Sequence, residues 1–79
     1  MEREEYIYKK LGNLSALDKA LAEEIVEHIG EWATINEAAK YLKNHKNTIY
    51  ERVEEGDVIS RRIGNKILIY TRSLIFLLE

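Results

Sequence analysis

Residues 34–56, TINEAAKYLKNHKNTIYERVEEG, decide the fold of this chain. Two stretches within them, residues 34–42 and 47–55, place apolar side chains at helical spacing. The residues between them, KNHK at 43–46, are all polar and interrupt that spacing. Two short helices joined by a brief polar turn predict a helix-turn-helix unit.

The ends of the two predicted helices are also marked in the sequence. Thr34 followed by Glu37 is a capping box, in which the two residues exchange side-chain to backbone hydrogen bonds. Asn44 or Asn47 can cap the second helix, and Gly56 is a typical stop. The side chains predicted to face inward from the two helices are Ile35, Ala38, Ala39, Leu42, Ile49 and Val53.

Beyond this segment the apolar period changes from that of a helix to that of a strand. Residues 58–63 and 66–70 alternate and flank a Gly-Asn pair, which predicts a two-residue β-hairpin. Thr71 can cap a last helix over residues 72–79. Five consecutive apolar residues in that helix, at 74–78, must be covered by a core or by a partner.

Two helices are predicted before the decisive segment. Residues 2–11 favour a short helix, although the Tyr-Ile-Tyr triplet at 6–8 leaves a strand open. Residues 15–29 form a better helix, because Ser15 with Asp18 resembles a capping box. An apolar stripe at helical spacing runs along it through Leu17, Ala20, Leu21, Ile25 and Ile29. The predicted fold is therefore mostly α with a small β-hairpin wing, a winged helix-turn-helix with an N-terminal helical extension.

The domain organisation follows from the same elements. Residues 34–79 are predicted to be the winged helix-turn-helix domain, and residues 1–33 the helical extension and a candidate for dimerisation. The charge is divided in nearly the same way. Residues 1–39 carry four basic and nine acidic side chains, whereas residues 40–72 carry eight basic and four acidic ones. Such a division suggests one face built for an anion, although a small, highly charged surface can also vary this much without purpose.

The composition excludes several classes of protein. The chain has no cysteine and two histidines, so neither a disulfide nor a structural zinc site is expected. No apolar run approaches the roughly 18 residues of a membrane span, and the charged N-terminus does not resemble a signal peptide. There is no glycine-rich phosphate loop, nucleophile elbow or metal constellation. We therefore expect a cytoplasmic protein that is not an enzyme, with no cofactor, no metal and no small-molecule substrate.

The second helix of the predicted unit is suited to double-stranded DNA. It is short enough to lie in a major groove roughly 12 Å wide, and its backbone N–H groups at the N-terminal end favour an anion. Basic residues of the hairpin would meet backbone phosphates. The candidate DNA-binding residues are His45, Lys46, Asn47, Thr48, Tyr50, Arg52, Arg61, Arg62 and Lys66.

Over residues 34–78 the sequence resembles the winged helix-turn-helix domain of phage and transposon excisionases, which is related to the DNA-binding domain of MerR-type regulators. The matching marks are T-x-x-E-A-A-x-x-L at 34–42, T-I-Y at 48–50, Gly-Asp at 56–57, R-x-I-G at 61–64 and S-L-x-x-L-L at 73–78.

The resemblance implies a DNA-binding module with its second helix in the major groove. The positions that fall where that family contacts DNA are Lys46, Asn47, Thr48, Tyr50, Arg62 and Lys66. The chain departs from the family at Lys43–His45, where small residues or serine are common, and at Glu51, where a basic residue is common. An acid on this helix weakens phosphate contacts unless it accepts a hydrogen bond from a cytosine.

Two functions remain open at this stage. The first is a sequence-specific DNA-binding protein, acting as a small transcription regulator or as an excisionase-like accessory factor in recombination. The second is a winged-helix module that binds another protein instead of DNA. One recognition helix covers few base pairs, so we expect a homodimer. Its predicted seam contains Leu17, Leu21, Ile25, Leu74, Phe76 and Leu77; the alternative is that residues 1–33 pack on their own domain.

Overall fold

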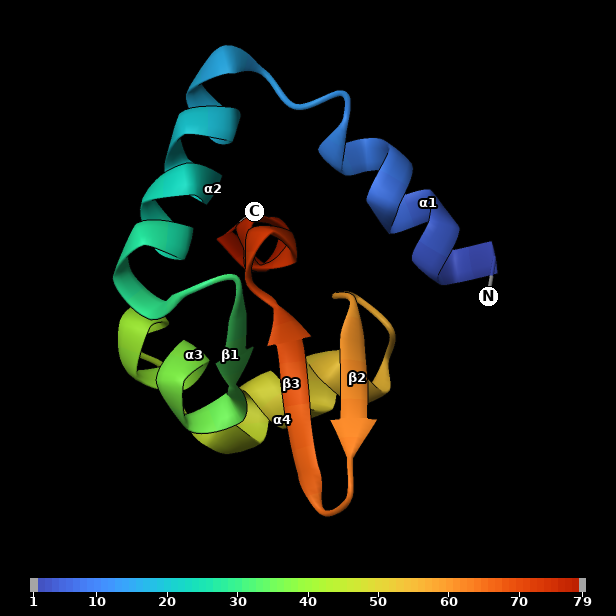
Figure 1. Ribbon diagram of the computed structural model, residues 1–79, viewed down its shortest axis with the longest axis vertical. Helices are drawn as coiled ribbons and strands as arrows, with labels where there is room; N and C mark the ends of the chain where they lie inside the picture. The colour runs from blue at the N-terminus through green and yellow to red at the C-terminus, as the bar shows by residue number, and fades with distance from the viewer. Residues whose placement is uncertain (1, 79) are drawn as a thin grey trace.

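The computed structural model describes residues 2–78 and has the predicted mostly helical architecture with a small antiparallel sheet (Figure 1). In chain order the elements are α1 (Glu2–Leu11), α2 (Ala16–Ile29), β1 (Trp32–Thr34), α3 (Ile35–Leu42), α4 (Lys46–Glu54), β2 (Ser60–Ile63), β3 (Lys66–Tyr70) and the 3₁₀ helix η1 (Thr71–Leu78). The helical reading of residues 2–11 is confirmed, and the alternative strand at 6–8 is wrong.

Two of the predicted helix caps are present. The Ser15 hydroxyl accepts a hydrogen bond from the Asp18 backbone N–H at 3.1 Å. Thr34 and Glu37 form the full capping box, with distances of 3.1 Å and 2.9 Å. These contacts satisfy N–H groups that the first turn of a helix cannot pair internally.

The predicted cap of α4 is wrong. His45, not Asn44 or Asn47, occupies the N-cap position, and it makes no side-chain capping bond. Asn44 instead uses its side-chain oxygen to accept a hydrogen bond from the His45 backbone N–H at 2.8 Å. The reason lies in the turn: Lys43 ends α3 in the left-handed conformation, with φ of 55°, and the chain then enters α4 at His45, one residue after Asn44 and two residues before Asn47.

The sheet contains the predicted hairpin and one strand that was not predicted. β2 and β3 pair antiparallel through the Gly64–Asn65 turn, and Gly64 has the positive φ of 59° that this tight turn requires. β1 pairs with the other edge of β3, giving the order β1-β3-β2. With three residues, β1 is too short to show an alternating pattern in the sequence.

The sheet and helices enclose two neighbouring apolar clusters. α3 and α4 lie behind the sheet in Figure 1, and η1 lies between α1 and α2. The larger cluster joins the sheet to α2, α3, α4 and η1 through Ile25, Ala38, Ala39, Ile49, Val58, Ile69 and Leu74. The smaller one attaches α1 and contains Ile7, Ala22, Ile59, Ile75 and Phe76.

The last helix differs from the prediction in type and in capping. It is a 3₁₀ helix that begins at Thr71, and the Thr71 hydroxyl is buried without a hydrogen-bond partner among the described residues. Ser73 is also fully buried. Its hydroxyl accepts from the Ile59 N–H at 3.1 Å and donates to the Tyr70 carbonyl at 2.6 Å. Ser73 therefore ties the start of η1 to the segment before β2, and residue 79 of the predicted helix lies outside the described residues.

Replacing Thr71 with valine is expected to stabilise the fold by about 1–2 kcal/mol, because it removes an unpaired buried hydroxyl while keeping the shape of the side chain. Urea unfolding followed by circular dichroism measures the change. Ser73→Ala is the comparison. It leaves the Ile59 N–H and the Tyr70 carbonyl without their hydrogen bonds to Ser73, so it should destabilise the fold by a similar amount. A Thr71→Val variant that is less stable than the parent would contradict the assignment.

Candidate nucleic-acid interface

The start of α4 is left open for an anion. α2 and α3 each carry an acidic residue in the first turn, Asp18 and Glu37, whereas α4 carries none. Its N-cap side chain makes no hydrogen bond, and its first helical residue is the cation Lys46. A basic residue at this end opposes the helix dipole, so local stability does not explain it. The free N–H groups and the added positive charge together suit a phosphate.

One face of α4 is anchored and the other is exposed. Ile49 is 2% exposed and packs in the larger core cluster, with Val53 one turn later against it. Lys46, Asn47 and Tyr50 are exposed, and their spacing of three and four residues places them on one face. Of the remaining candidates, His45 is exposed and Thr48 is half-buried. The structure therefore brings most of the predicted residues of this helix together on its outer face.

Arg52, at the far end of α4, is engaged within the chain. Its Nε donates to Asp57 at 2.7 Å, and Arg3 of α1 donates to the other carboxylate oxygen at 2.8 Å. Partial burial acts to raise the pKa of Asp57, but the two guanidinium groups outweigh it and hold that pKa below its usual value. Arg3 also donates to the Gly56 carbonyl at 3.1 Å. Arg52 thus ties the end of α4 to α1, a role that the sequence analysis did not predict.

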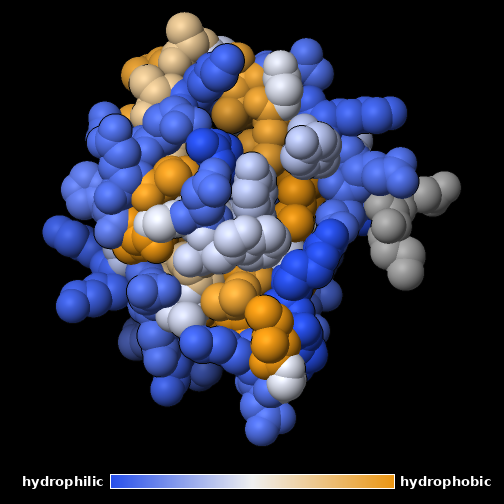
Figure 2. Space-filling view, in the orientation of Figure 1, coloured by the Kyte–Doolittle hydropathy of each residue, from blue (hydrophilic) through white to orange (hydrophobic). Residues whose placement is uncertain are grey.

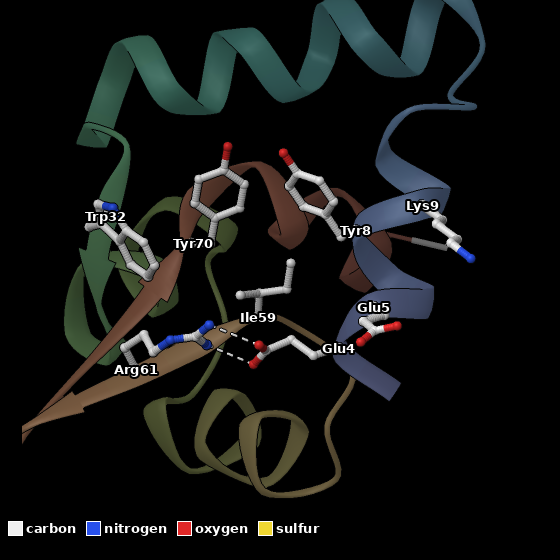
Figure 3. Close-up of a pocket in the computed structure, with 8 residues that line it drawn as sticks. All are labelled: Glu4, Glu5, Tyr8, Lys9, Trp32, Ile59, Arg61 and Tyr70. Atoms are coloured by element: carbon white, nitrogen blue, oxygen red, sulfur yellow. Dashed lines mark hydrogen bonds and ion pairs between the residues drawn. The ribbon is translucent and has the colours of Figure 1, made fainter. Parts of the chain in front are cut away.

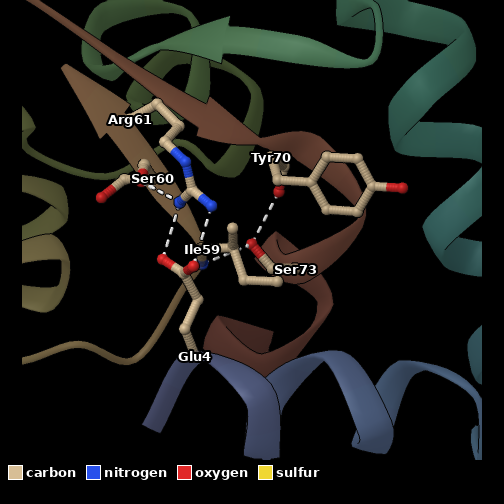
Figure 4. A network of polar contacts seen from close by, with 6 residues as sticks. All are labelled: Glu4, Ile59, Ser60, Arg61, Tyr70 and Ser73. Carbon is tan, nitrogen blue, oxygen red and sulfur yellow. Dashed lines mark hydrogen bonds and ion pairs between the residues drawn. The ribbon is translucent and has the colours of Figure 1, made fainter. Parts of the chain in front are cut away.

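The three basic residues of the hairpin are divided between the two faces of the sheet. Arg61 is directed toward α1, where it forms a two-pronged ion pair with Glu4 at 2.7 Å and 2.9 Å (Figure 4). This ion pair lowers the pKa of Glu4. Arg62, next in the strand, lies on the opposite face beside Val53 of α4. Lys66 is exposed beside the hairpin turn, which extends beyond α4 in Figure 1.

These pairings change where the positive charge is available. Arg72 of η1 is held by Glu23 at 2.9 Å and by Glu31 at 2.8 Å, and these hydrogen bonds raise its pKa. With Arg52 and Arg61 also paired, the cations of residues 40–72 for which the structure shows no ion pair lie in the last turn of α3, around the α3–α4 turn and in the hairpin. They are Lys40, Lys43, Lys46, Arg62 and Lys66. The basic half of the chain is therefore reduced to a smaller surface around the start of α4.

The residues of the predicted dimer seam are mostly occupied inside the monomer. Ile25, Leu74 and Phe76 are 1%, 0% and 8% exposed, because η1 packs against α2 and α1 of the same chain. They are therefore not available to a partner. Leu77 is half-buried, whereas Leu17 and Leu21 of α2 are 69% and 36% exposed. The described part of the N-terminal extension, residues 2–33, packs on its own domain, which was the stated alternative.

The described residues 2–78 offer neither a membrane span nor a metal site. No helix there is long and apolar enough to cross a bilayer. No group of three or more histidine, aspartate or glutamate side chains is placed to hold a metal ion.

Comparison with known proteins agrees with this geometry. The family model described as "Helix-turn-helix domain" matches residues 32–79, which include both helices of the unit, the whole sheet and η1. No curated protein and no solved structure matches the chain significantly. Because the family model covers more than half of the sequence, the chain belongs to the helix-turn-helix domain family.

Proposed function

We propose that the chain binds double-stranded DNA in a sequence-specific manner, without catalysis, through the outer face of α4. The observation that carries the proposal is the start of α4, which lacks a capping side chain and an acidic residue and bears Lys46. Membership in the helix-turn-helix family supports the same conclusion. The sequence resemblance of residues 34–78 to excisionases, and through them to MerR-type regulators, is the reason to propose a role in recombination or in transcription regulation.

In this proposal the contacts have separate tasks. Phosphate oxygens are bound by the N–H groups at the start of α4, by Lys46 and, from the hairpin, by Arg62 and Lys66. Asn47 is the group suited to reading a base, because its amide can make two hydrogen bonds to adenine. Glu51, Glu54 and Glu55 repel phosphates at the other end of the helix, so the N-terminal half carries the contact.

Binding is expected to weaken with salt. The logarithm of the binding constant should fall with the logarithm of the salt concentration with a slope of about −3, because Lys46, Arg62 and Lys66 each neutralise one phosphate. Lys66→Ala should lower affinity for all sequences alike and reduce that slope by about 1. Asn47→Ala should leave the slope unchanged and lose discrimination at one base pair, by about 1–3 kcal/mol. Fluorescence anisotropy with a selected site and with random duplex, between about 50 and 200 mM salt, measures both quantities.

Arg61→Ala is the matched control for the hairpin, because the Arg61 guanidinium is already held in an ion pair by Glu4 of α1. It should leave the salt slope unchanged. If duplex DNA is not retained at about 50 mM salt and a protein concentration above about 10⁻⁴ M, the DNA-binding proposal fails. The winged-helix module that binds another protein then becomes the better reading.

The two cellular roles make different demands on the DNA. An accessory factor in recombination has to bend or bridge its site, whereas a repressor can act by occupying a straight one. Gel mobility of fragments that carry the bound site at different positions measures the bend. A position-dependent mobility supports the recombination role, and a uniform mobility supports the regulator.

We also propose that the chain forms a homodimer in solution, through Leu17 and Leu21, the part of the predicted seam that remains exposed. Leu17 and Leu21 are 69% and 36% exposed, and Leu21 lines one hollow with Leu14 and with Leu78, which is 54% exposed. Leu17→Glu should therefore lower the mass measured by sedimentation equilibrium at tens of micromolar, without loss of helical signal. A mass near 9.3 kDa for the parent chain that does not rise with concentration contradicts the pairing.

A further inference from the structure

α1 and the outer face of the sheet enclose a hollow of about 450 Å³ that the proposed DNA contact does not use (Figure 3). This volume lies within the range of small-molecule sites, about 300–1,000 Å³. Tyr8 of α1 forms one wall, Tyr70 of β3 and Trp32 of β1 form the other, and Ile59 forms the floor. Figure 2 shows that apolar and aromatic residues run along this face of the molecule between charged ones.

Two of the three aromatic residues of the walls are exposed, and the third, Tyr70, is half-buried against the smaller core cluster. Tyr8 is 66% exposed and Trp32 is 43% exposed, and Trp32 contacts Tyr70 with ring centroids 5.3 Å apart. In Figure 3 the rings of Tyr8 and Tyr70 stand on opposite sides of the gap, with their hydroxyl groups directed the same way and Ile59 between them below. A hollow bordered by three aromatic rings suits a flat aromatic group, which packs on such rings by offset stacking or edge-to-face contact.

The floor and one wall are held rigidly. The Tyr70 N–H donates to the Ile59 carbonyl at 2.8 Å. The buried Ser73 hydroxyl joins the Ile59 N–H to the Tyr70 carbonyl, at 3.1 Å and 2.6 Å (Figure 4). Two residues of the hollow are thus fixed relative to each other by three hydrogen bonds. A site that is already ordered loses less conformational entropy when it binds a ligand.

The polar groups at the hollow balance in charge. Glu4 and Arg61 neutralise each other at one end, and Glu5 and Lys9 contribute one charge of each sign from α1. This balance favours an uncharged ligand over an anion or a cation. Arg61 already uses its guanidinium on Glu4 and on the Ser60 carbonyl at 2.8 Å. The second N–H of Arg61 Nη2, beyond the one donated to Glu4, can donate a hydrogen bond to a nitrogen at a polar ring edge.

We propose that this hollow binds an uncharged, planar heteroaromatic molecule of one to three fused rings. The ligand lies between Tyr8 and Tyr70, over Ile59, with its polar edge toward the Glu4–Arg61 ion pair. The proposal concerns binding alone and assigns no reaction to the hollow. The site is separate from α4 and Arg62, so its test does not depend on DNA binding.

Trp32 reports on the hollow directly, because it is the chain's one tryptophan and gives a single indole N–H signal in a ¹⁵N-labelled sample. Titration with quinoline, which is flat and uncharged at neutral pH, is expected to shift that signal and the Tyr70 amide signal to saturation. The expected Kd is about 1 mM, as befits so small a ligand. Camphor, which is uncharged but not flat, should produce no saturable shift.

Tyr8→Ala is expected to weaken quinoline binding about tenfold, because stacking on one ring is lost. Tyr6→Ala is the matched control: Tyr6 is 56% exposed on the same helix and does not line the hollow, so binding should be unchanged. Shifts that do not saturate, that camphor reproduces or that survive Tyr8→Ala overturn the proposal. Saturable shifts with an oligothymidylate strand but not with quinoline also overturn it, because the flat group that the hollow binds would then be an unpaired base of single-stranded DNA.

Discussion

Replacing Leu74 with alanine is expected to lower the free energy of unfolding by about 3–5 kcal/mol, the largest effect of any single change considered. Leu74 is fully buried in the larger core cluster, where η1 meets α2 and the sheet. A domain of this size has a total stability of about 4–12 kcal/mol, so the loss removes a large share of it. Thermal unfolding should shift downward by more than about 12 °C.

Leu78→Ala is the matched control for this prediction. It removes the same atoms from the same helix, but Leu78 is 54% exposed, so stability should change by less than about 0.5 kcal/mol. Urea unfolding of both variants gives the comparison. Equal losses at the two positions would mean that η1 packs differently, with residues 74–78 shared between a core and a partner.

The contrast between these two leucines also marks how far the sequence could predict the fold. The helix boundaries at Ser15 and Thr34 and the hairpin turn at Gly64 were predicted because each depends on residues within a few positions of one another. The run at 74–78 has no polar residue, so its pattern could not show which side faces inward. Which of these side chains face the core depends on where α2 lies, and tertiary packing decides that position.

The candidate site was predictable to the same limit. The prediction grouped residues of α4 and the hairpin because a helix-turn-helix followed by a hairpin is a local order of elements that the sequence shows. The pairing of Arg61 with Glu4 spans 57 residues of sequence and that of Arg3 with Asp57 spans 54. No local pattern reports contacts at such separations. The sequence therefore identified the cations and could not say which of them were already neutralised.

Lys46→Glu is expected to change DNA affinity and stability in opposite directions. Lys46 is the first helical residue of α4, next to N–H groups that no side chain caps. A glutamate there interacts favourably with the helix dipole, so the free energy of unfolding should rise by about 0.3–1 kcal/mol. The same carboxylate replaces a phosphate contact with repulsion, so affinity for duplex DNA should fall at least tenfold at about 0.1 M salt, and the salt slope should lose about 1.

Lys19→Glu makes this prediction specific to α4. It changes the net charge by the same amount at an exposed position near the start of α2, far in sequence from the proposed contact. Any general effect of net charge on DNA affinity appears in both variants, and only Lys46→Glu should show the additional loss. Urea unfolding and fluorescence anisotropy on the same samples give both quantities. Equal affinity for the two variants would place α4 outside the DNA interface.

A Lys46→Glu variant that is less stable than the parent would show that the start of α4 is not left open as described. The expected outcome is a loss of DNA affinity together with a gain of stability, because this helix end is kept basic for a ligand at the expense of the fold.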